Sequence, residues 1–316
     1  MAIHQIEPGQ DRCADVFCSD QPPVVTVEPG DTVRVRTLDA WGHLSRQRAP
    51  GEPRPLMFPA KRGHCLVGPI AVRGAHPGQH VAVRLVSLRP DGWGFTVAGG
   101  RDNVLNRRLS TATTEPSWLL WELDHEAGTG TNQFGHRVDL NPFLGVTGVA
   151  PEHGEHSTIP PRTATAGNID CKELLAGSTL FIPVTVNDAL LYVGDGHAAQ
   201  GDGEVGGTAI ECGMTTELVL DLLDDAPVAG VHAITPTSRI TFGFSDDLNV
   251  ATGDALDAML SWMQQLLDID RPTALAVASV TLDLRITQIA NETWGVHALL
   301  AHGSVTPKYP GQVSER

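Results

Sequence analysis

The feature that most constrains this chain is the repeated alternation of short apolar runs with turn-forming residues. The 316 residues include 33 glycines and 22 prolines, and these are spread between the apolar runs. Strand-length runs such as Val24–Val27, Phe143–Val149 and Ala189–Val193 are followed closely by glycine or proline. Many short runs joined by turns are typical of a largely β protein. With 41% hydrophobic residues, a chain of this length can bury a substantial core.

Two segments share the pattern P-G-x-x-V-x-V, one beginning at Pro29 and the other at Pro77. In the first segment, Val33 and Val35 alternate with polar residues, so both face the same side of a strand. Proline followed by glycine is a strong turn signal. We therefore expect each segment to form a hairpin of one small barrel or sandwich.

The apolar period changes near residue 254. Apolar residues then recur at helical spacing along one face, namely Leu256, Met259, Leu260, Met263, Leu266 and Leu267. This spacing predicts an amphipathic helix, with Asp254 as its N-cap. A second helix is expected over Thr273–Val280, and Trp294–Leu300 resembles a strand.

These patterns predict a mainly β fold, built from small barrel or sandwich units, with a smaller C-terminal α+β part. We place the β-rich body, which carries the candidate site, at residues 1–225 and the α+β part at residues 226–316. The tail from Pro307 is expected to be frayed.

Composition narrows the functional classes. The formal net charge is −15, and no basic stripe is present, which disfavours nucleic acid as a partner. Met1–Gln10 lacks the basic and apolar regions of a secretory signal, and no apolar stretch approaches the ~20 residues of a membrane span. The five cysteines are scattered and form no CxxC pair, which favours reduced thiols. We therefore expect a cytoplasmic protein with no membrane partner.

The densest group of polar side chains lies in Gly194–Glu204. Among four glycines, this segment contains Asp195, His197, Gln200, Asp202 and Glu204. Asp195 and His197 share a face if they lie on a strand, and in a Gly-rich loop they can wrap one ion. Carboxylate oxygen and neutral imidazole nitrogen are suitable ligands for Zn²⁺ and similar divalent ions. An ordinary acidic turn is the alternative, but three carboxylates with His and Gln favour a site.

A second candidate segment is Gly167–Lys172. Here Asp170 is a possible metal ligand, and Asn168 is placed to hold a substrate carbonyl or amide. Gly-Asn is also a common turn, which is the simpler interpretation of this segment alone. Cys171 beside a lysine is a candidate nucleophile, although a buried inert thiol is the commoner case.

Two weaker candidates complete the set. Glu152 or the neighbouring His153 could act as a general base or ligand, and a solvated loop is an equal alternative. Asp39, with His43 nearby, follows a predicted strand, where a lone Asp is usually a cap or turn residue.

Taken in chain order, these segments resemble the acetamidase/formamidase family. Gly194–Val205 is similar to the family signature G-D-x-H-A-x-x-G-D-G-E, and Gly167–Lys172 to its Gly-Gly-Asn segment with a following Asp and Lys. Gly145–Glu152 is similar to G-x-x-G-V-A-P-E, and Gly68–Ile70 to a Thr-Gly-Pro hairpin. The matches span most of the first two-thirds of the chain, and the long central signature is the specific one.

The resemblance implies a β-rich, homo-oligomeric enzyme, as a dimer or tetramer, that hydrolyses short amides such as formamide or acetamide to a carboxylate and ammonia. It also implies a divalent metal, with Zn²⁺ favoured over Ca²⁺. The ligands would be Asp170, Asp195 and His197, with Asp39 as a further candidate.

The catalytic roles follow from motif position and chemistry. Either Glu152 or Glu204 would carry the proton from water to the leaving nitrogen, and the choice between them stays open. Asn168 would donate to the developing oxyanion, and Gln200 would also contact substrate or oxyanion.

The sequence also departs from the family pattern. Ala166 stands where the first Gly of Gly-Gly-Asn is usual, Val67 replaces the usual Thr, and residues 100–142 have no match that assigns their role. If these departures change the pocket, a second interpretation of the chain is a non-catalytic or differently specific metal-binding β protein on the same fold. A third is an interaction protein whose Gly/Asp loop binds structural Ca²⁺.

Overall fold

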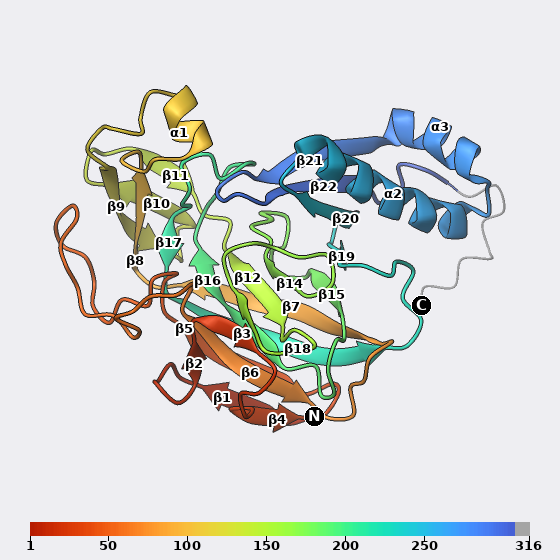
Figure 1. Cartoon of the computed structure of the whole chain (residues 1–316), viewed down its shortest axis with the longest axis horizontal. Coiled ribbons are helices and arrows are strands. Elements are labelled where there is room, and N and C mark those ends of the chain that lie inside the picture. Colours follow the sequence, from red (N-terminus) through yellow and green to blue (C-terminus); the bar gives the residue numbers. More distant parts are fainter. Residues whose placement is uncertain (307–316) are drawn as a thin grey trace.

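Two large β-sheets form the body of the computed structural model, which describes residues 1–306 (Figure 1). The strands of the first sheet are β1 (Ile3–Ile6), β5 (Thr32–Thr37), β7 (His80–Pro90), β15 (Thr179–Pro183), β18 (Met214–Leu223), β19 (His232–Ile234), β20 (Ser238–Ser245), β21 (Leu282–Gln288) and β22 (Trp294–Ala301). Their order is β1-β5-β18-β7-β15-β19-β20-β22-β21.

The second sheet carries the polar segments singled out in the sequence, on or next to β14 and β16. Its strands are β2 (Cys13–Ala14), β4 (Val25–Val27), β6 (Leu66–Val72), β8 (Trp93–Ala98), β9 (Ser117–Asp124), β10 (Thr129–Asn132), β11 (Arg137–Asp139), β12 (Phe143–Val149), β14 (Ala166–Asn168), β16 (Leu191–His197) and β17 (Glu211–Cys212). The main path is β11-β10-β9-β8-β17-β16-β12-β14, and β6 pairs with β16, β2 and β4. Two further strands, β3 (Val16–Cys18) and β13 (Glu155–Ser157), pair with each other.

The predicted mainly β fold with a smaller C-terminal α+β part is confirmed. Alternation in β5 buries Val33 and Val35 completely, as the period of two requires. One buried cluster joins apolar residues of both sheets, including Val33 of the first and Val193 of the second. The two sheets therefore share a single core.

The two P-G segments are not hairpins, which corrects the expectation from sequence. β4 pairs with β6 in the second sheet, whereas β5 pairs with β18 in the first. Likewise β6 lies in the second sheet and β7 in the first. Each turn therefore carries the chain from one sheet to the other, a pairing that local turn chemistry does not specify.

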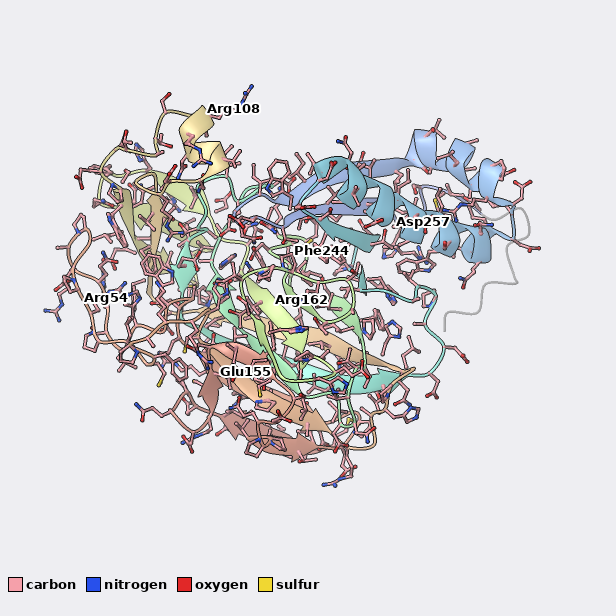
Figure 2. The ribbon with its side chains drawn as sticks, in the orientation of Figure 1. Arg54, Arg108, Glu155, Arg162, Phe244 and Asp257 are labelled. Atoms are coloured by element: carbon pink, nitrogen blue, oxygen red, sulfur yellow. The ribbon has the colours of Figure 1, made fainter. Side chains whose placement is uncertain are left out.

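The structure contains a short helix α1 (Val104–Arg108) and two longer helices, α2 (Leu248–Leu267) and α3 (Arg271–Thr281). Asp247 caps α2 by accepting a hydrogen bond from the backbone N–H of Asn249, so the predicted cap Asp254 lies inside the helix instead. Asp257 of α2, which is labelled in Figure 2, forms an ion pair with Arg271 at the start of α3. The buried face of α2 packs on β20 and β22.

The proposed boundary between residues 225 and 226 falls between β18 and β19, two strands of the same sheet. That division therefore stays a prediction. The tail from Pro307 lies outside the described residues. Across residues 1–306, no helix is both long enough and apolar enough to cross a membrane.

Candidate active site and metal centre

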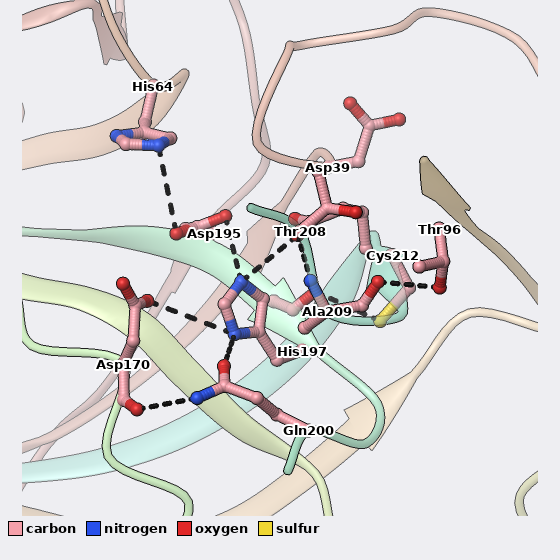
Figure 3. Close-up of polar contacts among 12 residues, drawn as sticks. Asp39, His64, Thr96, Asp170, Asp195, His197, Gln200, Thr208, Ala209 and Cys212 are labelled. Atoms are coloured by element: carbon pink, nitrogen blue, oxygen red, sulfur yellow. Dashed lines mark hydrogen bonds and ion pairs between the residues drawn. The ribbon is translucent and has the colours of Figure 1, made fainter. Parts of the chain in front are cut away.

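The site is built around the end of β16, in the middle of the second sheet. Asp195 and His197 lie two residues apart on this strand and are almost fully buried. The register pairs His197 with Glu211 of β17, which brings these two side chains together across the strands. Nε2 of His197 lies 3.3 Å from Oδ1 of Asp195 (Figure 3) and 3.4 Å from Oε1 of Glu211. One imidazole nitrogen thus faces two carboxylates.

The second ring nitrogen of His197, Nδ1, contacts Gln200. Oε1 of Gln200 lies 2.9 Å from Nδ1 of His197, and Nε2 of Gln200 donates to the backbone carbonyl of Asp170 at 2.7 Å (Figure 3). An amide oxygen is an acceptor, so Nδ1 carries a proton, and the neutral ring then presents the lone pair of Nε2 to a cation. Metal-binding histidines are usually oriented in this way by a partner on the second nitrogen.

Two more carboxyl groups reach the same point from outside β16. Asp170 follows β14, and its Oδ1 lies 3.9 Å from Nδ1 of His197. Glu204 comes from the loop after β16 and is 7% exposed. Ligand atoms of Asp170, Asp195 and His197 lie within 4.8 Å of one another, as do those of His197, Glu204 and Glu211.

The backbone is strained at three of these carboxyl residues. The φ angles of Asp170, Asp195 and Glu204 are 53°, 58° and 42°, in the left-handed region. Such a conformation costs about 1–3 kcal/mol for a residue other than glycine and persists only where the surroundings enforce it. Ala166, which departs from the usual glycine of the family segment, also has a positive φ of 58°.

Gly145 of β12 makes room for the cluster. A Cβ atom at this position would lie 2.6 Å from Oδ2 of Asp195, 2.7 Å from Oδ1 of Asp170 and 2.8 Å from Cε1 of His197. These distances are shorter than van der Waals contact, so any larger residue would displace the cluster. The glycine is therefore required by the approach of three polar side chains to one strand.

A cavity of about 210 Å³ opens onto the carboxylates. Its walls include Asp170, Asp195, Glu204 and Glu211, together with residues from distant segments such as Lys61, His64, Asn168 and Arg101. Arg101 lies within residues 100–142, a segment whose role the sequence alone does not indicate. Liquid water occupies about 30 Å³ per molecule, so the cavity accommodates only a small ligand with a few waters.

Burial and mutual repulsion govern the protonation of the carboxyl groups. Burial, with the nearby Asp195, raises the pKa of Glu211 to about 7 against the opposing effect of His197. Burial, and then the charge of Asp170, raises the pKa of Glu204 well above its usual value. Burial also raises the pKa of Asp170. For Asp195, burial acts in the same direction, but the His197 and His64 rings outweigh it and lower the pKa.

The donor set fits a divalent cation. Among residues 1–306, no hydrogen-bond partner is found for either carboxylate oxygen of Asp170, for Oε2 of Glu211 or for Nε2 of His197. Buried polar groups without partners are costly, and buried anions require compensation by protons or by a cation. One imidazole cannot neutralise four carboxylates. A cation among these atoms would satisfy both requirements.

The structure brings together most of the residues expected from sequence. Asp170, Asp195, His197, Gln200 and Glu204 converge as described above. Asn168 lines the cavity, where its Nδ2 donates to the carbonyl of Ile159 at 3.0 Å and its buried Oδ1 has no partner in the described chain. The free atom of Asn168 is therefore an acceptor, which suits a substrate N–H group better than the expected oxyanion.

Two expected residues lie apart from the cluster. The side chain of Glu152 is 76% exposed and lies 3.5 Å from His153, and it does not line the cavity. Asp39 is buried but accepts hydrogen bonds from Nδ1 of His43 at 2.9 Å and from the backbone of Trp41. Arg54, at the left of Figure 2, lies 4.0 Å from the same carboxylate. Asp39 is thus already satisfied by its own loop.

Sequence reasoning missed Glu211 and His64. Nε2 of His64 lies 4.0 Å from Oδ2 of Asp195. Its Nδ1 lies 3.2 Å from Oγ1 of Thr158, which already accepts the backbone N–H of His64 at 2.7 Å. The threonine hydroxyl can donate to Nδ1, and in that tautomer Nε2–H of His64 is a donor at the cavity wall. Neither residue belongs to a dense polar motif, although His64 does stand at the start of an apolar run.

The comparisons with known proteins agree with this fold. A model of the Acetamidase/Formamidase family matches residues 4–155 and 153–290. An acetamidase of Mycolicibacterium smegmatis is 25% identical over 281 residues, which cover 69% of this chain and 67% of the relative. A formamidase of Methylophilus methylotrophus is 26% identical over 282 residues, covering 70% and 68%. The crystal structure of an acetamidase from Bacillus halodurans has a TM-score of 0.83 at 24% identity, covering 94% of this chain and 97% of that chain.

Together these matches identify the chain as an amidohydrolase that acts on C–N amide bonds. The chain belongs to the acetamidase/formamidase family. The family and the enzyme class predicted from sequence are both confirmed.

Proposed function

We propose that this protein hydrolyses a small amide, of the formamide or acetamide type, to a carboxylate and ammonia with a divalent cation bound in the cavity. One observation carries the proposal: four buried carboxyl groups surround the ring of His197, whose Nε2 faces Asp195 and Glu211 and has no hydrogen-bond partner among the described residues. The proposal assigns His197, Asp195, Glu211 and Asp170 as the residues that would hold the cation.

Zn²⁺ is the favoured cation because an imidazole nitrogen takes part. Ca²⁺ binds through six to eight oxygen ligands and seldom uses nitrogen, whereas Zn²⁺ accepts His with carboxylates. When bound, such a cation polarises an amide carbonyl and lowers the pKa of a water ligand from about 15.7 to about 7. Hydrolysis otherwise fails because the carbonyl is a weak electrophile and the nitrogen is a poor leaving group.

Glu204 is assigned as the proton carrier. It lines the cavity, and burial, together with the charge of Asp170, raises its pKa well above the usual value, so its carboxyl group holds a proton more strongly than an exposed glutamate does. It would accept the proton of the attacking water and deliver it to the leaving nitrogen. Glu152, the other candidate from sequence, has no route to the cavity from its exposed position.

The other cavity residues position the substrate. Nε2–H of His64 is directed to the carbonyl oxygen, where one well-aimed donor contributes about 2.7–4 kcal/mol to the transition state. The free Oδ1 of Asn168 accepts an N–H of the amide. Gln200 is expected to act indirectly, because both ends of its amide already bind His197 and Asp170.

The cavity size favours short amides, although each methylene discriminates by only about 1–3 kcal/mol. The test is ammonia release from formamide, acetamide, propionamide and cyclic amides, with and without a chelator and added Zn²⁺. Zinc-dependent release from the shortest amides supports the proposal. No release from any of them supports the alternative of a non-catalytic or differently specific metal-binding protein.

The cellular setting is part of the same proposal. All five cysteines are free thiols, which supports a reducing, cytoplasmic environment. A homo-oligomer, dimer or tetramer, is expected by similarity and can be measured by light scattering.

A further inference from the structure

A second group of ligand-type side chains lies next to the active site but shares no residue with it. Cys171 and Glu173 follow Asp170 in the chain, and His297 comes from the middle of β22. Their ligand atoms lie within 4.8 Å of one another. Cys171 and His297 are completely buried, and the side chain of Glu173 is 15% exposed.

The spacing of these atoms suits a tetrahedral cation. Sγ of Cys171 lies 3.3 Å and Nε2 of His297 lies 3.4 Å from the same oxygen, Oε2 of Glu173. Zinc bonds of about 2.0–2.3 Å in tetrahedral geometry place neighbouring ligand atoms about 3.3–3.6 Å apart. The three side chains therefore need little movement to share one ion.

Groups around the cluster fix its ligands in the required state. Nδ1 of His297 lies 2.8 Å from Oγ1 of Thr287, which can accept the ring proton and leave Nε2 unprotonated. Nη1 of Arg285 donates to Oε1 of Glu173 at 2.9 Å, which leaves Oε2 for the ion. Second partners of this kind orient metal ligands in proteins.

A plain hydrogen-bonded network explains the cluster less well. Nε2 of His297 has no hydrogen-bond partner among residues 1–306, although the ring is completely buried. Buried polar atoms of folded proteins nearly always have a partner.

We propose that Cys171, Glu173 and His297 form a second divalent metal site, of the zinc class, with water in the fourth position. Binding forms a sulfur–metal bond, and the thiol proton is released to solvent. The bound ion would tie the segment that carries Asp170 to β22 in the C-terminal part of the chain. This site does not depend on the proposed amide hydrolysis.

Cobalt substitution tests the site without relying on activity. The full-length protein is freed of metal with a chelator and loaded with Co²⁺. Wild type is expected to show a near-ultraviolet thiolate-to-cobalt charge-transfer band, and Cys171→Ser is expected to lose the band and one equivalent of bound metal. Cys212→Ser is the matched control, because Cys212 is buried beside Glu211 and its thiol donates to the carbonyl of Gly196 instead. It should keep the band.

A measurement on wild type covers the case in which Cys171→Ser fails to fold. X-ray absorption of the zinc-loaded protein should include a sulfur neighbour at about 2.3 Å. Absence of both the band and the sulfur neighbour in wild type overturns the site, as does a band that persists in Cys171→Ser. If wild type shows the cobalt charge-transfer band but releases no ammonia from any amide, the result counts against the proposed function and not against the second metal site.

Discussion

Oε1 of Gln200 lies 2.9 Å from Nδ1 of His197, and this contact determines which ring nitrogen faces the carboxylates. The same side chain donates to the backbone carbonyl of Asp170 at 2.7 Å. One amide therefore sets the imidazole tautomer and also ties the ring to a second candidate ligand. Nε2 of His197 is left facing Asp195 and Glu211.

Replacing Gln200 should weaken metal binding without touching a ligand. Gln200→Leu removes the acceptor for Nδ1–H, and loss of such a partner typically costs about 10–100-fold in metal affinity. Gln200→Glu keeps an acceptor and should restore most of the affinity. Competition with a chromophoric chelator measures the zinc dissociation constant of each variant. Equal affinities for wild type and Gln200→Leu would show that Gln200 does not position the ring.

The two glutamates named from sequence should respond differently to the same substitution. Glu204→Gln removes the proton carrier and should lower kcat about 10²–10⁴-fold, with bound zinc retained. Glu152→Gln changes an exposed side chain outside the cavity and should leave kcat and zinc content unchanged. Steady-state ammonia release with parallel metal analysis decides between them. A large loss of kcat in Glu152→Gln would show that Glu152 takes part in catalysis.

Substituting alanine for Gly145 tests whether the polar cluster needs the space that this glycine leaves. Gly145→Ala brings a Cβ atom against Asp195 and Asp170, and should cost about 1–3 kcal/mol of stability together with most of the bound metal. Gly201→Ala is the control, because a Cβ atom there meets nothing within 4 Å. Calorimetry and metal analysis of both variants provide the comparison. Unchanged zinc binding in Gly145→Ala would mean that the cluster tolerates displacement.

The metal-free protein should lose stability as the pH rises through the weakly acidic range. The folded pKa of Glu211 is raised from 4.5 to about 7, so the folded state binds more protons than the unfolded state between these values. Stability from this group is complete below pH 4.5 and falls as the pH approaches 7. The raised pKa values of Glu204 and Asp170 act in the same direction.

Added Zn²⁺ should remove this dependence, because a bound cation stabilises the ionised carboxylates. Melting temperatures of chelated and zinc-loaded protein between pH 4.5 and 7.5 provide the measurement. A chelated protein whose melting temperature rises across this range would contradict the assigned protonation.

For one segment, the end of β16 and the loop after it, the local sequence pattern alone pointed to the residues that line the candidate site. The stretch after β16 is so rich in Asp, His, Gln and Glu that Asp195, His197 and Glu204 stand out without a structure. Glu211 does not stand out, because it reaches His197 only through the register of β17 with β16. Strand pairing joins residues far apart in sequence, and a single sequence does not encode it visibly.

The same limit applies to the fold. Alternation predicted the strand β5, whose burial alternates, and short apolar runs predicted β12 and β22, which are buried along nearly their whole length. Sheet order was not accessible in this way, so the P-G turns were interpreted as hairpins although they connect different sheets. Glu152 was named by its place in a motif, and only the course of the following loop shows that it is exposed.

The most direct test of the metal-dependent site compares ammonia release by chelated wild type, His197→Ala and Asp195→Ala before and after Zn²⁺ is added. We predict that chelated wild type is inactive and recovers with zinc. Both variants should stay inactive and bind one equivalent less metal than wild type. Full amide hydrolysis by the metal-free wild type, or by His197→Ala, would contradict a mechanism that needs a cation held at this imidazole.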